Sequence, residues 1–133
     1  MRCAARVGMR RMLVVDDDEV IREVVASALE DEGYTVSVAG DGLQALADVR
    51  REPPDGIVLD LMMPRMNGWE FVAACRREPR CGDIPIVVMS AAHNLPSAAE
   101  QLLRVGVRAC VAKPFDLDAL LGVVERLVPP AVR

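Results

Sequence analysis

Apolar residues follow two alternating spacings along this chain. Short continuous apolar runs are typical of buried strands, and an apolar residue at every third or fourth position is typical of an amphipathic helix. The expected strands are 12–15, 34–39, 57–59, 84–90 and 109–112, and the expected helices are 20–29, 43–50, 68–77, 98–105 and 117–127. Because strands and helices alternate, the pattern predicts an α/β fold: a parallel sheet with helices on both faces.

Residues that start and stop helices support these bounds. Gly33 and Gly106 lie where the first and fourth helices should end. Capping boxes, in which a short polar side chain and a Glu or Gln three residues later satisfy each other's backbone, are expected at Asp41–Gln44, Asn67–Glu70 and Ser97–Glu100. Asp116 is expected to cap the last helix.

Composition limits the classes of function. The chain has 133 residues and is 52% hydrophobic but only 3% aromatic, which predicts one domain with an aliphatic core. Its net charge of −4 argues against direct binding of nucleic acid or of an anionic membrane. No apolar run reaches the roughly 18 residues of a membrane span.

The two ends and the cysteines complete the domain prediction. Residues 1–10 form a basic lead-in without the apolar core of a secretion signal, which we expect to be disordered, and 129–133 form a tail. Residues 11–128 are expected to be the folded domain. The four cysteines (Cys3, Cys75, Cys81 and Cys110) show no metal-ligand spacing, so we expect reduced thiols and a cytoplasmic location.

Polar residues that can do chemistry stand at the ends of the expected strands. They are Asp16 and Asp17 after the first strand, Asp60 after the third, Ser90 after the fourth and Lys113 after the fifth. Right-handed crossovers place these strand ends along one edge of the sheet. Clustered carboxylates repel one another, and one lysine cannot neutralise them all. Oxygen ligands of this kind suit Mg²⁺.

Each of these residues also has an ordinary explanation when taken alone. An acidic run such as Asp16–Glu19 is typical of a solvated helix N-terminus. Ser90 could simply end a strand, and Lys113 could be a surface charge. However, Lys113 is the only lysine in a sequence with fifteen arginines, which suggests a place that needs a compact point charge.

Four segments, in order, carry a family resemblance: Leu13–Asp17 (LVVDD), Asp60–Gly68 (DLMMPRMNG), Val88–Ala91 (VMSA) and Lys113–Phe115 (KPF). Together they resemble the receiver domain of the response regulators of two-component signalling, over about residues 11–128. The resemblance implies a stand-alone receiver with a flavodoxin-like, doubly wound five-stranded sheet in the order 2-1-3-4-5.

The resemblance also implies roles for the strand-end residues. Asp60 would be the phosphoacceptor for a histidine kinase or a histidine phosphotransfer protein in a phosphorelay. Mg²⁺ would be bound by Asp17, Asp60 and the backbone carbonyl of Met62, and by Asp16 through a water molecule. Ser90 and Lys113 would hold the phosphoryl oxygens. The protein would catalyse only its own phosphorylation and dephosphorylation, and would signal by binding a downstream protein rather than as an enzyme.

Some positions depart from the family pattern or refine it. By the resemblance, Ser90 and the residue at 110 would be the switch positions, and Cys110 stands where the family usually has an aromatic side chain. In the family, the positions of Met62 and Ala92 flank the path of a hydrolysing water. The family places a cis peptide before the proline of Lys-Pro, so we expect one at Lys113–Pro114.

Two other classes of protein have to be weighed against a receiver. An aspartyl-phosphate enzyme such as a phosphatase typically has a second Asp two residues after its nucleophile, where this chain has Met62. A flavin or nucleotide binder would have Gly, Ser or Thr around a phosphate after the first strand, where this chain has acids. Both patterns fit the sequence less well than the receiver does.

Overall fold

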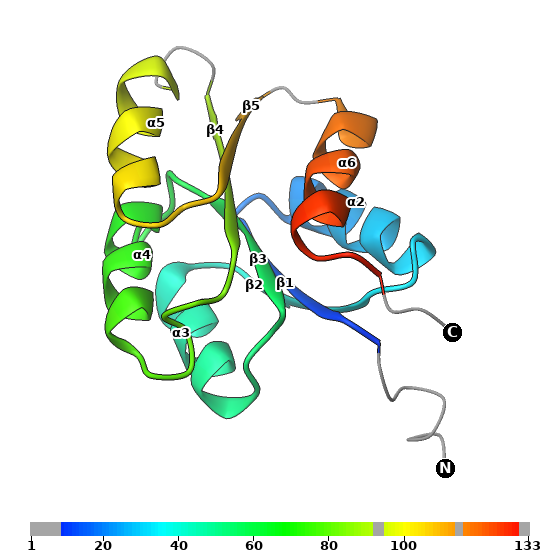
Figure 1. The fold of residues 1–133 in the computed structure, drawn as a ribbon, viewed down its shortest axis with the longest axis horizontal. Coiled ribbons are helices and arrows are strands. Elements are labelled where there is room, and N and C mark those ends of the chain that lie inside the picture. The colour runs from blue at the N-terminus through cyan, green and yellow to red at the C-terminus, as the bar shows by residue number, and fades with distance from the viewer. Residues whose placement is uncertain (1–8, 92–94, 114–115, 131–133) are drawn as a thin grey trace.

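The fold is known from a computed structural model that describes residues 9–91, 95–113 and 116–130. Strands and helices alternate along these residues, as the sequence pattern predicts (Figure 1). The strands are β1 (Arg11–Val15), β2 (Thr35–Ala39), β3 (Gly56–Asp60), β4 (Ile86–Ala91) and β5 (Ala109–Lys113). The helices are α2 (Glu19–Asp31), α3 (Gly42–Arg51), α4 (Gly68–Arg77), α5 (Leu95–Arg104) and α6 (Leu117–Leu127).

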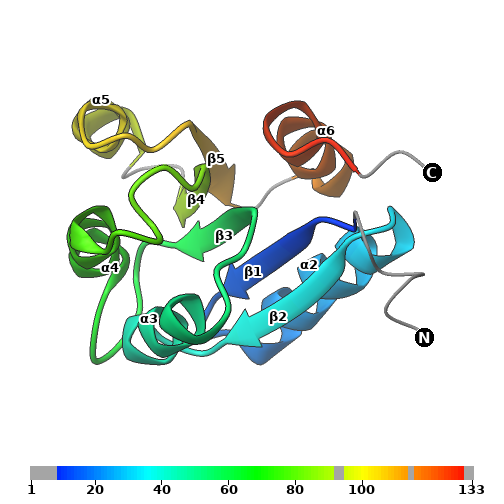
Figure 2. The same ribbon diagram turned by 60° about the horizontal axis from the view of Figure 1, so that its bottom comes forward.

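The five strands form one parallel sheet in the order β2-β1-β3-β4-β5, which confirms the predicted fold class and strand order. Helices α3, α4 and α5 cover one face, and α2 and α6 cover the other (Figure 2). No helix among the described residues is long and apolar enough to cross a membrane.

The core consists of two apolar layers, one on each face of the sheet, because neighbouring side chains of a strand point to opposite faces. Leu13, Ile57 and Val88 pack in the layer beneath α3, α4 and α5, whereas Val14 and Val58 pack beneath α2 and α6. These side chains are at most 1% exposed. A shift of one residue in any strand would exchange the two layers and displace the polar residue at its end, so packing fixes where the strands end.

Three predicted helix caps are confirmed. The Asp41 side chain accepts from the Gln44 N–H, Asp116 caps α6, and Asn67 and Glu70 form a full capping box. The predicted box at Asp41 is only half formed, because Gln44 Oε1 accepts from the Gly40 N–H rather than from the Asp41 N–H. The predicted box at Ser97 is wrong as a helix start, because α5 already begins at Leu95. Proline is well tolerated in the first turn of a helix, so Pro96 permits this earlier start.

The fourth strand and the cysteines also differ from the prediction. Strand β4 begins at Ile86 rather than at residue 84, because the Ile84 N–H donates to the Cys81 carbonyl in the preceding turn. That turn brings Cys81 back to Cys75 at a Cα–Cα distance of 5.2 Å, within the range that a disulfide spans. The sequence pattern did not predict this approach, whereas Cys110 is free.

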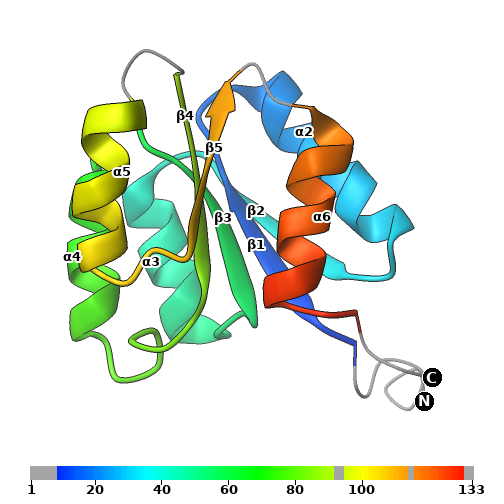
Figure 3. The same cartoon turned by 45° about the horizontal axis from the view of Figure 1, so that its top comes forward.

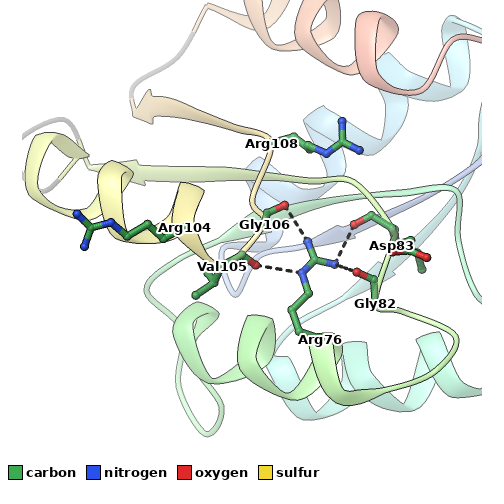
Figure 4. A pocket seen from close by; sticks show the side chains of 8 residues that line it. Arg76, Gly82, Asp83, Arg104, Val105, Gly106 and Arg108 are labelled. Atoms are coloured by element: carbon green, nitrogen blue, oxygen red, sulfur yellow. Dashed lines mark hydrogen bonds between the residues drawn. The ribbon is translucent and has the colours of Figure 1, made fainter.

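A hollow lies beside Arg76, near the ends of α4 and α5 and away from the acidic strand ends (Figure 4). The Arg76 guanidinium fills part of it and donates to backbone carbonyls of two separate loops. The acceptors, at 2.9–3.2 Å, are the carbonyls of Cys81, Gly82, Ile84, Val105 and Gly106. Arg76 thus joins α4 to the loops that precede β4 and β5, and its donors are used for structure rather than for a ligand.

Replacing Arg76 should therefore lower stability. Hydrogen bonds that involve a charged group contribute more than neutral ones, so we expect Arg76→Met to lower the free energy of unfolding by about 2–3 kcal/mol. Urea denaturation measures this. Arg77→Met is the matched control, since Arg77 is exposed in the same helix turn and should cost less than about 0.5 kcal/mol. Equal losses in the two variants would contradict this role for Arg76.

Candidate functional site

Strands β1 and β3 lie side by side and parallel, so both end at the same carboxyl edge of the sheet (Figure 3). One carboxylate oxygen from each of Asp16, Asp17 and Asp60 lies within 4.8 Å of the others. Asp16 is fully buried and Asp60 is 5% exposed, whereas Asp17 faces solvent. The sequence prediction that these acids converge is confirmed by this geometry.

Both carboxylate oxygens of the buried Asp16 already accept hydrogen bonds from other residues of the protein. Its Oδ1 accepts from the Asp18 N–H at 2.8 Å, and its Oδ2 accepts from Lys113 Nζ at 3.0 Å. Lys113 Nζ also lies 3.4 Å from Asp60 Oδ1. Since both oxygens of Asp16 have partners, the carboxylates best placed to bind a cation directly are Asp17 and Asp60.

The electrostatics show an excess of negative charge. Burial raises the pKa of Asp60 from its ordinary 3.8 to about 6, and the negative charge of Asp16 adds to this shift, while Lys113 opposes it. Burial alone would lower the pKa of Lys113, but the hydrogen bond to Asp16 and the charge of Asp60 more than offset it, so that pKa is raised. Lys113 therefore stays protonated, and a further cation would stabilise the ionised acids.

Ser90 supplies a hydroxyl near this edge. It is 1% exposed, and among the described residues its oxygen has no hydrogen-bond partner. A buried hydroxyl without a partner is costly unless something binds to it. Ser90 is paired with Ala112 in the β4–β5 register, one position before the pair Ala91 and Lys113.

The residues at this edge fit Mg²⁺. Carboxylate and carbonyl oxygens with space for water suit this ion, and it would relieve the repulsion among the acids. The Met62 N–H donates to Asp60 Oδ1 at 3.3 Å, which holds the Met62 peptide beside the acid. The sequence-predicted residues Asp16, Asp17, Asp60, Met62 and Lys113 thus lie together.

Cys110, the other predicted switch position, lies farther down β5. It is paired with Val88, two residues before Ser90, and packs against the same layer of the core as Val88. Cys110 and Ser90 therefore face the same side of the sheet. Ala92 and the predicted cis peptide at Lys113–Pro114 lie outside the described residues.

Sequence reasoning missed two arginines that hold this edge. Arg22 Nη1 donates to the Asp16 carbonyl at 3.2 Å, and Arg65 forms an ion pair with Asp41 at 2.7 Å. Arg22 lies in the first turn of α2 and its acceptor is a backbone carbonyl outside the helix, so no local pattern indicates this contact. Arg65 lies in a loop far from Asp41 in sequence, so no local pattern indicates the pair.

The raised pKa of Asp60 makes a prediction about stability. Between about pH 4 and 6 the folded protein keeps a proton on Asp60 that the unfolded chain has lost, so stability falls as pH rises through this window. Above pH 6, without metal, Asp60→Asn should raise the free energy of unfolding by about 1–2 kcal/mol, an amount reduced by partial access of water. Urea denaturation from pH 4 to 8 measures this, with the exposed Asp118→Asn as control. A gain that grows toward pH 4 would refute the shift.

Comparison with known proteins shows which family this chain resembles. A family model for the response regulator receiver domain matches residues 12–125. Response regulator MprA of Mycobacterium leprae is 40% identical over 119 residues, which are 89% of this chain and 50% of that protein. MprA of Mycobacterium avium is 39% identical over the same shares. The chain thus spans about half the length of these relatives.

Several solved structures have the same fold as this chain. The chemotaxis response regulator CheY4 of Vibrio cholerae is 35% identical with a TM-score of 0.83, over 90% of this chain and 99% of that one. The receiver domain of sensor histidine kinase PA1611 of Pseudomonas aeruginosa, with magnesium in its active-site cleft, is 28% identical with a TM-score of 0.80, over 90% and 97% of the two chains. Because the family match covers most of the sequence and these neighbours share its fold, the chain belongs to the response regulator receiver domains of two-component signalling.

Proposed function

We propose that Asp60 is the phosphoacceptor of this receiver and takes a phosphoryl group from the phosphohistidine of a histidine kinase or of a histidine phosphotransfer protein. The observation that carries the proposal is the position of Asp60. It is a buried carboxylate 3.4 Å from the Lys113 ammonium and beside two further acids.

The charge state of Asp60 suits a nucleophile. With a pKa of about 6, the carboxylate is largely ionised at neutral pH without being wholly stabilised by partners. An Asp60 oxygen would form a bond to phosphorus while the phosphorus–nitrogen bond of the donor breaks and its electron pair returns to the imidazole. Lys113 and Ser90 would then hold the phosphoryl oxygens, since both can donate hydrogen bonds there.

A metal ion would complete the site. We propose that Asp17, Asp60 and the Met62 carbonyl bind Mg²⁺ directly, with Asp16 acting through water. Bound Mg²⁺ supplies positive charge to the phosphoryl oxygens, and phosphoryl transfer depends mostly on such neutralisation and on positioning. The full use of Asp16 by Asp18 and Lys113 supports its indirect role.

The response to phosphorylation would be a change in protein binding. Ser90 would move toward the phosphoryl group, but Cys110 on the same face is too small to follow as an aromatic side chain would, so the change would pass through the backbone after Ser90 and through α5. We propose a downstream protein as the partner, in the cytoplasm, with no direct contact of this domain with nucleic acid or membrane.

A phosphatase acting on external esters is less well supported, because Met62 cannot act as the acid or base that such an enzyme needs.

Phosphorylation can be tested directly. With Mg²⁺ and acetyl phosphate, we expect the protein to gain one phosphoryl group, detected by intact mass, and Asp60→Asn to gain none. Chelation of Mg²⁺ should abolish labelling of the unaltered protein. Asp118→Asn is the control and should be labelled normally, because Asp118 is exposed on α6. Undiminished labelling of Asp60→Asn would remove Asp60 from the mechanism.

The lifetime of the phosphorylated state gives a second test. Met62 is 61% exposed at the edge of the site and cannot orient a water molecule, so we expect slow loss of the phosphoryl group. Met62→Asn should speed that loss several-fold, because an amide can hydrogen-bond to the attacking water. The decay of phosphoprotein after removal of the donor measures this. Met62→Leu, which stays apolar, should decay like the unaltered protein, and equal rates in all three would count against this role.

A further inference from the structure

We infer that the ion pair between Asp41 and Arg65 positions the loop that carries the Met62 carbonyl. This proposed metal ligand is then held in place before Mg²⁺ binds. The inference rests on the proposed function, because it assigns Met62 to the metal. Asp41 and Arg65 touch neither metal nor phosphoryl group, and are therefore positioning residues.

The loop in question, residues 61–67, connects β3 to α4 and is closed at its base. The Leu61 N–H donates to the Met89 carbonyl at 3.1 Å, and the Gly68 N–H donates to the Leu61 carbonyl at 2.8 Å. A side chain at Gly68 would come within 2.7 Å of the Leu61 Cα, so this closure requires glycine. The base of the loop is therefore held independently of its outer part.

The outer part of the loop is held by the turn between β2 and α3. Arg65 Nε and Nη2 both contact Asp41 Oδ2, at 2.8 and 2.7 Å. The adjacent Gly42 N–H donates to the Met66 carbonyl at 3.1 Å. Because β1 lies between β2 and β3 in the sheet, these contacts cross over the end of the strand that leads into Asp16 and Asp17.

The side chain of Asp41 is itself held in a fixed position. It is 7% exposed, and its second oxygen accepts from the Gln44 N–H at 2.9 Å as the N-cap of α3. That backbone hydrogen bond, and then the Arg65 side chain, lower the pKa of Asp41, so it is ionised at neutral pH. The helix behind it is fixed by the buried side chains Ala45, Leu46 and Val49.

Arg65 has a backbone conformation that a long side chain rarely adopts. Its φ of +63° lies in the left-handed region, which favours Gly or Asn. A substitution to glycine would relax this backbone, yet the chain has an arginine whose guanidinium reaches Asp41. The ion pair offsets the energetic cost of this backbone conformation. It also holds the loop in a single position, whereas glycine would allow several.

The consequence for the metal follows from the position of Met62. It lies between the closed base and Arg65, its side chain is exposed, and its N–H contacts Asp60 at 3.3 Å. Without the pair, residues 62–66 would sample more positions, and metal binding would have to order them. Because the Arg65 side chain is 63% exposed and contacts the loop rather than Met62 itself, loss of the pair should weaken binding only a few-fold.

A double-variant cycle tests the inference. Asp41→Asn keeps the capping oxygen but removes the charge, and Arg65→Gln removes the guanidinium. Each should weaken Mg²⁺ binding, measured by calorimetry, about two- to fivefold, and the double variant should be no weaker than the weaker single one. Arg65→Gly should also weaken binding although it relaxes the backbone. Arg51→Gln, which removes an exposed ion pair with Asp48 inside α3, is the control and should leave the affinity unchanged.

Hydrogen exchange in the metal-free protein gives an independent readout. The variants should exchange faster at the backbone amides of Met62, Met63 and Met66 while β3 and α3 stay protected. Unchanged Mg²⁺ affinity and unchanged exchange, or faster exchange throughout the domain, would overturn the inference. If the unaltered protein bound no Mg²⁺, the proposed function would fail, and exchange at the amides of Met62, Met63 and Met66 would still decide whether the pair holds the loop.

Discussion

The structure depends on an excess of negative charge at one edge of its sheet. Asp16, Asp17 and Asp60 face a single ammonium, that of Lys113, with Asp16 and Asp60 largely removed from water. Such an arrangement costs stability, as the raised pKa of Asp60 shows. A protein maintains a costly cluster of this kind where a ligand relieves it, and here a divalent cation and a phosphoryl group together would do so.

The rest of the fold holds that cluster in position. Two apolar layers fix the register of the strands, and the register fixes which residue stands at the end of each one. Helix α3 adds a second level of support, since Asp41 at its N-terminus holds Arg65 of the neighbouring loop. Arg76 performs a comparable structural task near the ends of α4 and α5, where it joins two loops. The chemistry is thus confined to one end of the sheet.

The sequence predicts features that follow from local pattern. The strand and helix order, the caps at Asn67 and Asp116, and the convergence of Asp60 with Lys113 all depend on periodicity or on the rule that parallel strands end along one edge. Features that depend on the path of the chain in three dimensions were not predicted. The approach of Cys81 to Cys75 depends on how the turn after α4 folds back, and the pair of Asp41 with Arg65 depends on loop conformation. The early start of α5 shows that a capping motif can also lie inside a helix.

A crystal structure of the protein with Mg²⁺ and beryllofluoride would test the central claim most directly, namely that the strand ends form one phosphoryl-accepting site. We expect beryllium bonded to an Asp60 oxygen, with the fluorine atoms contacted by Lys113 Nζ and the Ser90 hydroxyl. The metal should be bound by Asp17, Asp60 and the Met62 carbonyl. Beryllofluoride bonded to Asp16 or Asp17, or a metal bound without Asp60, would contradict that claim.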